Sequence, residues 1–414
     1  MLLKYGKENI ELEISRENLL GSLESKEIAS QPLDQLLKQS TLDPIGRPRL
    51  SHLLRKNKPQ DLVIVVSDKT RAIANYAKIL EFLVTEIIDA GIDEKNIEFV
   101  IALGTHAPHT VEENNSLYGD LPKTFHFAFH DCHQNLVSLG KTSTGLEVQV
   151  NKRVWDADFV IITGRIDFHY LAGFSGGRKS VMPGIASYAT IRDNHCKLRR
   201  NGVALARIEN NPIAQEMDEA CRLLGVQYLL NVVETPNKKT NQVFCGHPEF
   251  AFRQGVEYFT ALRTMKIPKV ADCTIVSAGG YPKDRDFFNS QKSLNFALNT
   301  LKPHGSIILI AQCAEGFGNE NFLRYLSETS IDELLNYREQ KIEVGGHRAF
   351  VTAEILKEHK VYVLSDLEPS ILSRMSFTPV SNGNDAHKLV VQEHGADFRA
   401  YVMPEGKAVL PVMN

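Results

Sequence analysis

The chain has 414 residues, with 47 lysines and arginines against 50 aspartates and glutamates, so its formal net charge is −3. This balance argues against a protein that binds nucleic acid or an anionic membrane through a basic face. No apolar run approaches the roughly 18–20 residues of a membrane span. The six cysteines form no C-x-x-C pair. We therefore expect a globular cytoplasmic protein without disulfides and without a nucleic-acid or membrane partner.

The first part of the chain alternates predicted strands and helices. Residues 2–14 alternate apolar and polar side chains, which predicts a β-ribbon rather than a signal peptide. Buried strands are predicted at 62–66, 97–103, 125–129, 158–163 and 228–233. Helices are predicted at 76–90, 211–224 and 248–263, with a polar turn before the last of these. Thr110 and Glu113 have the spacing of a capping box.

A second set of elements follows residue 265 and indicates another α/β domain. Its strands are predicted at 274–277, 306–310, 361–364 and 398–402. Its helices are predicted at 288–301, 320–326, 331–338 and 347–358. We therefore expect an α/β fold of two domains with mainly parallel sheets and a cleft between them. The expected domains are residues 1–265 and 266–414, and the extreme C-terminus could pack back on the first domain.

Polar side chains repeatedly follow the ends of the predicted strands. Asp68 and Arg71 follow the first buried strand, His106 the next, His130 the one after, and His169 the strand at 158–163. The carboxyl ends of parallel strands share one edge of an open α/β sheet, which is where such proteins bind ligands. We therefore expect these side chains to converge.

The segment 161–198 combines glycines with reactive side chains after a buried strand. Its glycines are Gly173, Gly176, Gly177 and Gly184, and between them lie Ser175, Arg178, Lys179 and Ser180. Glycine permits positive φ and a close approach of the backbone to a ligand. The sequence of this segment is close to the phosphate-binding P-loop motif, but Arg178 stands where that motif requires its second glycine. A surface loop with solvated charges is the plainer alternative.

Histidines near the sheet edge are candidates for acid–base chemistry. His106 and His169 could act on opposite faces of a substrate, since imidazole exchanges protons near neutrality; taken singly, each is better explained as a hydrogen-bonded structural residue. His126, His130 and His133 imitate metal-ligand spacing. However, positions 126 and 130 of one strand lie roughly 13 Å apart, so we interpret these three as structural.

Three cations could bind or react with a substrate. Arg71 offers a planar fork for a carboxylate or phosphate, although a strand-end salt bridge would explain it as well. Lys179, next to Arg178, is a candidate for covalent chemistry because a lowered pKa makes an amine nucleophilic. Lys292 could hold a carboxylate, or it could be an ordinary surface lysine.

Several segments, and their order along the chain, resemble the nickel-dependent lactate racemase family of 2-hydroxyacid racemases and epimerases. In chain order they are SDKTR, GTHAPHT, HYLAGFSGGRKSVMPGIAS with His195 beyond it, and GGYPKD with Lys292 after it. The resemblance covers most of the chain and both expected domains. It implies nickel and a pyridinium-3-thioamide-5-thiocarboxylate mononucleotide, the nickel pincer nucleotide, which is made by dedicated biosynthesis enzymes.

The resemblance also implies a role for each matching residue. Lys179 would carry the cofactor covalently as a thioamide, and His195 would bind nickel. His106 and His169 would be the acid and base, while Arg71 and Lys292 would hold the substrate carboxylate. The remaining cofactor contacts would come from Asp68, Thr70, Ser175, Gly176, Gly177 and Arg178. The implied reaction moves the substrate Cα hydride to the cofactor and returns it on the other face.

Three departures from the family pattern concern the substrate. Ala72 follows Arg71 where the family has proline, and Asn289 stands where lactate-specific members have glutamine. His347 and Arg348 occupy the region of a pocket-closing tryptophan, and could admit a larger or more polar substrate. We therefore expect a 2-hydroxyacid racemase or epimerase that need not prefer lactate. The alternatives are a non-catalytic nickel- or nucleotide-binding protein and, less favoured, a P-loop-like enzyme that uses nucleotides.

Overall fold

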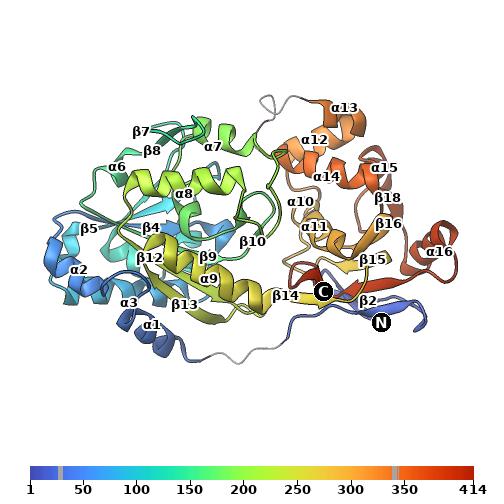
Figure 1. The fold of residues 1–414 in the computed structure, drawn as a ribbon, viewed down its shortest axis with the longest axis horizontal. Helices are drawn as coiled ribbons and strands as arrows, with labels where there is room; N and C mark the ends of the chain where they lie inside the picture. The colour runs from blue at the N-terminus through green and yellow to red at the C-terminus, as the bar shows by residue number, and fades with distance from the viewer. Residues whose placement is uncertain (27–30, 338–342, 344) are drawn as a thin grey trace. The chain divides into compact units, whose positions relative to one another are not determined.

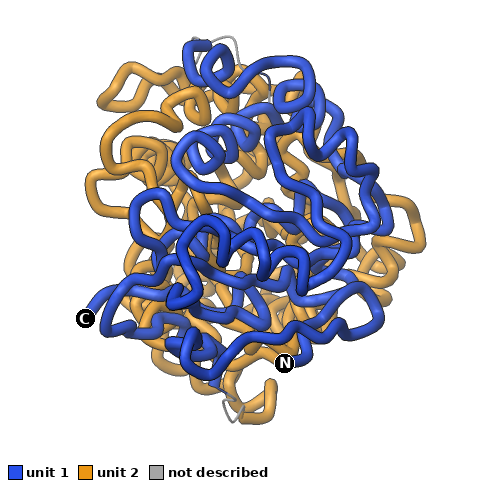
Figure 2. The backbone as a smooth tube through the Cα atoms, turned by 90° about the vertical axis from the view of Figure 1, so that its right-hand side faces the viewer, with its two compact units in different colours: residues 1–26, 263–414 blue, residues 27–262 orange. Residues whose placement is uncertain are grey.

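The computed structural model describes residues 1–26, 31–337, 343 and 345–414. Its backbone divides into two compact units, coloured in Figure 2: unit 1 contains residues 1–26 and 263–414, and unit 2 contains residues 27–262. In the described part of the chain, no helix is both long and apolar enough to cross a membrane. Both units are built on mainly parallel sheets, which confirms the predicted α/β class.

The sheet of unit 2 has the order β13-β12-β9-β4-β5-β6, and all its neighbours are parallel except β13 and β12. Its strands are β4 (Leu62–Ser67), β5 (Ile97–Ala102), β6 (His126–Phe129), β9 (Phe159–Ile166), β12 (Tyr228–Glu234) and β13 (Thr240–Gly246). The polar turn predicted before residue 248 is therefore wrong in part, because 240–246 form the edge strand β13. The polar start of that strand, Thr240-Asn241-Gln242, hides its extended conformation from an apolar pattern.

Helices cover both faces of this sheet (Figure 1). They are α1 (Leu33–Leu42), α2 (Leu50–Asn57), α3 (Tyr76–Asp89), α4 (Val111–Tyr118), α5 (Leu121–Thr124), α6 (Lys152–Trp155), α7 (Tyr188–His195), α8 (Pro212–Leu224) and α9 (Pro248–Arg263). Helices α1, α2 and α3 pack into one apolar core with alternate residues of the strands, such as Ile64 and Phe99. The predicted capping box at Thr110 and Glu113 is present at the start of α4. Two small hairpins complete the unit, β7 (Leu136–Lys141) with β8 (Glu147–Asn151), and β10 (Phe168–His169) with β11 (Gly173–Phe174).

The sheet of unit 1 has the order β18-β17-β16-β15-β19-β3, and every neighbouring pair is parallel. Its strands are β3 (Leu19–Ser22), β15 (Ala271–Ser277), β16 (Leu301–Ile310), β17 (Lys360–Leu364), β18 (Thr378–Val380) and β19 (Ala400–Met403). Its helices are α10 (Phe287–Ser290), α11 (Leu294–Ala297), α12 (Glu320–Glu328), α13 (Ile331–Asn336), α14 (His347–Glu358), α15 (Pro369–Arg374) and α16 (Gly383–His394).

The prediction of one continuous helix at 288–301 is wrong. The segment is broken into α10, the 3₁₀ turn η4 (Gln291–Ser293), α11 and the 3₁₀ turn η5 (Leu298–Thr300), and residue 301 already begins β16. Polar side chains bond locally to main-chain carbonyls here: Ser290 donates to Asp286 O at 2.8 Å and Thr300 donates to Ala297 O at 2.7 Å. Such bonds compete with a regular helical ladder.

The N-terminal residues group with unit 1 rather than with the residues that follow them. The ribbon β1 (Leu2–Tyr5) with β2 (Glu8–Glu11) places Leu3 in the unit 1 core, and β3 extends the sheet of that unit. At the other end of the chain, β20 (Leu410–Met413) pairs with β14 (Thr264–Ile267), the segment at the expected boundary. The compact units thus differ from the expected domains, 1–265 and 266–414, mainly in residues 1–26.

Candidate active site

Asp68 and His106 meet at the carboxyl edge of the unit 2 sheet. Asp68 directly follows β4, and His106 lies in the loop after β5, the neighbouring parallel strand. The distance from Asp68 Oδ2 to His106 Nδ1 is 2.6 Å. Thr70 donates from its hydroxyl to the Asp68 carboxylate at 3.0 Å and lies 3.2 Å from His106 Nδ1. The sheet order therefore produces the convergence that the sequence predicted for Asp68 and His106.

The environment of Asp68 keeps it ionised and orients His106. The Asp68 side chain is 1% exposed, and burial by itself would raise the pKa of its carboxyl. The hydrogen bond and charge of His106, with the charge of Arg71 and the Thr70 hydroxyl, outweigh that effect and lower the Asp68 pKa. An ionised carboxylate only accepts hydrogen bonds, so it holds the proton of a neutral His106 on Nδ1. The lone pair of His106 Nε2 is then available as a base, and the ring is 41% exposed.

Arg71 ends the 3₁₀ turn η1 (Lys69–Arg71) and is half-buried. Burial lowers the pKa of its guanidinium, Asp68 raises it, and the charge of Arg165 lowers it further. Among the described residues, no side-chain hydrogen bond or ion pair occupies Arg71. Its fork is thus in place to receive an anion.

The glycine-rich loop is held to the sheet by its own polar groups. The 3₁₀ turn η3 (Gly177–Ser180) carries Lys179. Gly177 N donates to the buried Asn231 Oδ1 on β12 at 2.8 Å, and Ser180 Oγ donates to Thr163 O on β9 at 2.8 Å. Ser175 Oγ donates to Arg165 O at 3.1 Å. Asn231 was not singled out from the sequence, because a lone asparagine in a strand carries no motif.

Lys179 is a buried amine without a hydrogen-bond partner. Its side chain is 5% exposed, and Nζ has no hydrogen-bond partner among the residues that the structure describes. Burial lowers the pKa of this amine well below its ordinary value, and the nearby charges of Arg71 and Arg178 lower it further. A buried amine without a hydrogen-bond partner costs free energy of folding, so its presence calls for a chemical or binding role. Lowering this pKa increases the fraction of unprotonated amine, which is the nucleophilic form of lysine.

Gly177, two residues before Lys179, allows a test of how tightly the glycine-rich loop packs against α9. Gly177 has φ +53°, and a Cβ there would lie 2.6 Å from Phe252 Cγ on α9. We expect Gly177→Ala to lower the free energy of unfolding by about 2–4 kcal/mol, through left-handed strain and overpacking together. Gly145→Ala is the matched control, because Gly145 has φ +87° with no atom within 4 Å of its Cβ position. Equal midpoints of urea unfolding for the two variants would contradict the proposed clash.

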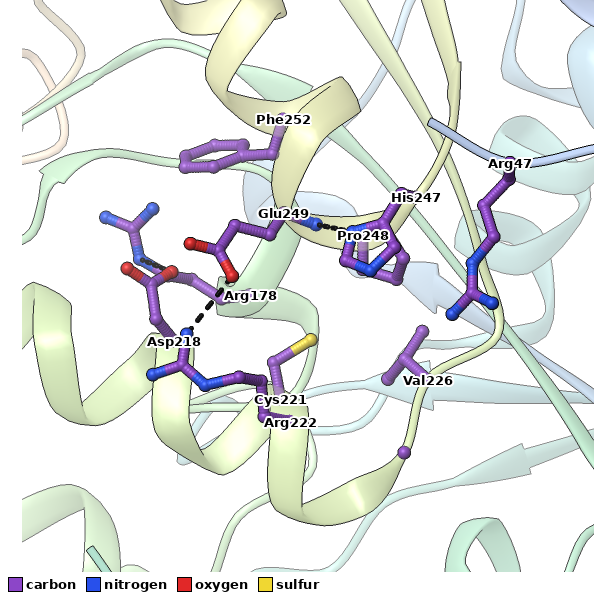
Figure 3. Close-up of a pocket in the computed structure, with 11 residues that line it drawn as sticks. Arg47, Arg178, Asp218, Cys221, Arg222, Val226, His247, Pro248, Glu249 and Phe252 are labelled. Carbon is purple, nitrogen blue, oxygen red and sulfur yellow. Dashed lines mark hydrogen bonds and ion pairs between the residues drawn. The ribbon is translucent and has the colours of Figure 1, made fainter. Parts of the chain in front are cut away.

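Arg178 points away from Lys179 toward α8 and α9. Its Nη2 donates to Ala172 O at 3.0 Å, Nε lies 3.3 Å from Asp218 Oδ1, and Cζ lies 4.5 Å from the centre of the Phe252 ring. The side chain is 2% exposed. A contact of Arg178 with a cofactor stays a prediction. The guanidinium itself contacts Asp218 on α8 and the Phe252 ring on α9 (Figure 3).

His169 and His195 come from different elements of the same unit. His169 ends β10, and its Nδ1 accepts from the main-chain nitrogens of Leu171 and Ala172 at 3.3 and 3.1 Å. A neutral His169 therefore carries its proton on Nε2, the opposite tautomer to His106. His195 is half-buried and ends α7, whose first turn is capped by Ser187.

The other histidines of this region hold the scaffold. Buried His130 donates from Nε2 to Ala186 O at 2.9 Å, while its Nδ1 lies 3.2 Å from Asn151 Nδ2. Within the described chain, no group of three or more His, Cys, Asp or Glu residues is arranged to bind a metal. His109 was not singled out from the sequence, although it belongs to GTHAPHT. Its Nε2 accepts from Lys69 N at 2.9 Å and so fixes the turn that carries Arg71.

In unit 1, Lys292 lies among the residues predicted to contact a substrate. Lys292 Nζ is 2.5 Å from Asn289 Oδ1, and Asn289 Nδ2 donates to Asp286 Oδ2 at 2.7 Å. Lys292 Nζ and Arg348 Cζ lie 5.8 and 4.6 Å from the centre of the Phe288 ring. His347, the first residue of α14, is buried, and burial lowers its pKa to about 4. His347 is therefore uncharged near neutral pH, which leaves Arg348 as the cation of this pair.

Comparisons with known proteins show which family this chain resembles. Residues 5–205 match the family described as lactate racemase N-terminal domain, and residues 267–411 match the lactate racemase C-terminal domain. Lactate racemase of Thermoanaerobacterium thermosaccharolyticum is 32% identical over 426 residues, covering 99% of this chain and 98% of that protein. Lactate racemase of Lactiplantibacillus plantarum is 31% identical over 425 residues, with the same coverage.

The similarity extends to solved structures. The lactate racemase apoprotein from Thermoanaerobacterium thermosaccharolyticum superimposes with a TM-score of 0.92 at 30% identity, covering 99% of both chains. A Thermotoga maritima protein matches with a TM-score of 0.67 at 17% identity, over 95% of this chain and all of that one, which bears on the fold alone. The chain belongs to the lactate racemase family and is therefore an isomerase.

Proposed function

We propose that this isomerase is a 2-hydroxyacid racemase or epimerase that works with a nickel pincer nucleotide attached to Lys179. The observation that carries the proposal is the buried amine of Lys179, which lacks a hydrogen-bond partner among the described residues and lies near Arg71. A protein retains such a group when it has a use for the amine.

The residues present fit the proposed cofactor. An unprotonated Lys179 amine is the form that condenses to a thioamide. The imidazole of His195, together with soft sulfur donors of the cofactor, would suit nickel. Because the cofactor would supply the sulfur ligands of the nickel, the protein would not need three metal-binding side chains of its own. The other proposed contacts are Asp68, Thr70 and the loop residues Ser175, Gly176, Gly177 and Arg178. When bound, the cofactor would supply a hydride acceptor and donor for the substrate Cα.

The chain's own residues would bind the substrate and move its proton. Arg71 would pair with the carboxylate, which fixes the hydroxyl near the histidines. His106 Nε2 would take the hydroxyl proton and later return it, while Asp68 holds the ring and stabilises the imidazolium that forms. His169, which carries its proton on Nε2 when neutral, would hydrogen-bond the substrate oxygen and serve the opposite enantiomer.

The preferred substrate can be tested by comparing the rates at which different 2-hydroxyacids racemise. The relatives are named for lactate, whereas Asn289 and Arg348 of this chain favour a larger or more polar 2-hydroxyacid in our proposal. Asparagine is one methylene shorter than glutamine, and Arg348 offers a planar donor fork for a second carboxylate or polar tail. A chiral assay in which lactate racemises far faster than malate, longer 2-hydroxyacids and aldonates would contradict this preference.

Lys292 provides a test of carboxylate binding. We expect Lys292→Ala to raise KM for the 2-hydroxyacid by about tenfold or more, because a charge-assisted hydrogen bond to the carboxylate is lost. Cofactor loading, measured by intact mass, should be unchanged. Lys302→Ala is the matched control, since Lys302 pairs with Asp272 at 2.7 Å and has no proposed contact with the substrate. Unaltered kinetics in Lys292→Ala would mean that Lys292 is an ordinary structural lysine.

The experiment that tests the proposal is intact mass and nickel content of protein produced together with the cofactor-synthesis enzymes. A mass adduct on Lys179 with about one nickel per chain would support it and justify a chiral screen. Unmodified mass without nickel, where a known family member is loaded, would overturn the cofactor assignment. A loaded protein without activity on any 2-hydroxyacid would favour the non-catalytic binding protein. Magnesium-dependent ATP turnover would favour the P-loop-like alternative.

A further inference from the structure

The loop that follows Arg71 is held by side chains from two other strands of the unit 2 sheet. Arg165, in β9, donates from Nη1 to Ala72 O at 3.1 Å. Glu234, the last residue of β12, accepts at Oε1 from Ala74 N at 2.6 Å. The strands lie in the order β12-β9-β4 and run parallel (Figure 1), so their carboxyl ends meet beside the loop that follows β4.

Arg165 and Glu234 also bind each other, so the two contacts to the loop are coupled. Arg165 Nη1 lies 3.0 Å from Glu234 Oε2, and Arg165 Nη2 lies 3.3 Å from Asp167 Oδ2. The side chains of Arg165 and Glu234 are only 16% and 4% exposed. Burial would lower the pKa of Arg165, but the charges of Asp167 and Glu234 and the Glu234 hydrogen bond raise it overall. The pair is therefore joined by a charge-assisted hydrogen bond, which is stronger than a neutral one.

The main chain at Ala72 has little else to fix it. Ala72 ends the turn η1 with φ −48° and ψ 137° and is exposed. Its main-chain nitrogen donates to no group among the residues that the structure describes. The guanidinium of Arg71, one residue earlier, is likewise without a side-chain hydrogen bond or ion pair in the described chain. The direction of the Arg71 fork thus depends on where the backbone of residues 71–74 is held.

We propose that Arg165 and Glu234 are positioning residues for the substrate carboxylate, because they hold residues 72–74 so that the Arg71 fork keeps its binding orientation. We call this pair the loop clamp. The inference rests on the proposed function, in which Arg71 binds the carboxylate of a 2-hydroxyacid. Bidentate pairing of arginine with a carboxylate depends on the orientation of the planar fork. Misplacing a binding group by about 1 Å can cost about 10²-fold in rate.

Two single variants separate positioning from a simple effect of charge. Arg165→Met removes a positive charge, so both explanations predict a higher KM. Glu234→Gln removes a negative charge, and a charge effect alone would then lower KM, since the site would attract an anion more strongly. Positioning predicts the opposite, because glutamine accepts with one oxygen in place of two, so that the contact with Ala74 N or the one with Arg165 is lost.

The measurement is KM and kcat for lactate and for malate, on protein that carries its cofactor. We expect KM to rise about tenfold in both clamp variants. The mass adduct should be unchanged, and kcat should change less than KM, because neither residue of the loop clamp is proposed to contact the cofactor or the reacting atoms.

Arg153→Met is the matched control for a merely structural role. Arg153 also binds two carboxylates, Asp61 at 2.6 Å and Glu98 at 2.6 Å. These carboxylates lie at the opposite edge of the sheet, since Asp61 precedes β4 and Glu98 is the second residue of β5. The control variant should lower the midpoint of urea unfolding, as Arg165→Met should, but leave KM unchanged. An equal rise of KM in Arg153→Met would overturn the positioning role.

The loop can also be examined in the cofactor-free protein, by a measurement that does not depend on the proposed function. Because Ala74 N donates to Glu234, its amide should be protected from hydrogen exchange. We expect that amide to exchange at least about tenfold faster in both clamp variants. In Arg153→Met it should exchange as in the original protein.

Arg71→Gln distinguishes failure of this inference from failure of the proposed function. A raised KM in Arg71→Gln, with the original KM in both clamp variants, would overturn the inference. A lowered KM in Glu234→Gln would overturn it as well. An unchanged KM in Arg71→Gln, with faster exchange at Ala74 in the clamp variants, would instead contradict the proposed function, because the loop clamp would then hold a residue that does not bind the substrate.

Discussion

Replacing Lys179 with methionine is expected to abolish covalent cofactor loading and, at the same time, to make the cofactor-free protein more stable by about 1–3 kcal/mol at neutral pH. The buried Lys179 amine lacks a hydrogen-bond partner among the described residues and lies near the like charges of Arg71 and Arg178. Methionine has a similar length and fills the same space without a group that must be desolvated. Loss of function with a gain in stability would be the signature of a residue kept for its chemistry.

The stabilisation should depend on pH in a defined direction. The pKa of Lys179 in the folded state lies well below its ordinary value, so between the two pKa values the unfolded chain binds more protons. The stability of the original protein therefore rises with pH across that window. The advantage of Lys179→Met should be largest below the folded-state pKa and shrink as pH approaches about 10.5.

Urea unfolding of both proteins from pH 6 to pH 10, with intact mass after co-production, measures both effects. Lys141→Met is the control, because Lys141 is exposed on β7 and its substitution should change neither loading nor the pH slope. A Lys179→Met protein that is less stable at every pH would contradict the description of Lys179 as an uncompensated buried amine.

Replacing His106 with alanine is expected to lower kcat by about 10²–10⁴-fold while leaving the mass adduct and nickel content intact. This range is what a positioned acid–base group usually contributes. Asp68→Asn should also lower kcat, because the amide no longer stabilises the imidazolium on Nδ1. The two losses should be far from additive in the double variant, since both act through the one ring joined by the 2.6 Å bond.

The control for this series is His126→Ala. His126 is exposed and lies 2.9 Å from Glu98 on the neighbouring strand, so it should leave kcat unchanged. Racemisation is followed by chiral chromatography from each enantiomer separately. If His106→Ala lost its nickel or adduct, His106 would belong to cofactor binding. If its kcat were unchanged, the Asp68–His106 pair would not be the acid–base group.

The sequence was sufficient for the elements whose pattern is local. Apolar-rich segments such as 62–66 and 97–103 predicted buried parallel strands, and the structure has β4 and β5 there. Spacing also predicted the cap at Thr110. The edge strand β13 was missed because its first residues are polar, and the helix at 288–301 was overextended because its side chains bond to their own backbone.

The sequence alone also determined the family and the identity of the candidate site residues, since those depend on residue type and order along the chain. The tertiary structure decided which of them touch. The order of β4 and β5 in the sheet brings Asp68 to His106, and the packing of η3 buries Lys179 while turning Arg178 toward α8. The pairing of β3 with β19 likewise assigns residues 1–26 to unit 1. Burial, hydrogen-bond partners and pKa shifts arise from atoms far apart in sequence, so no local pattern of residues could have supplied them.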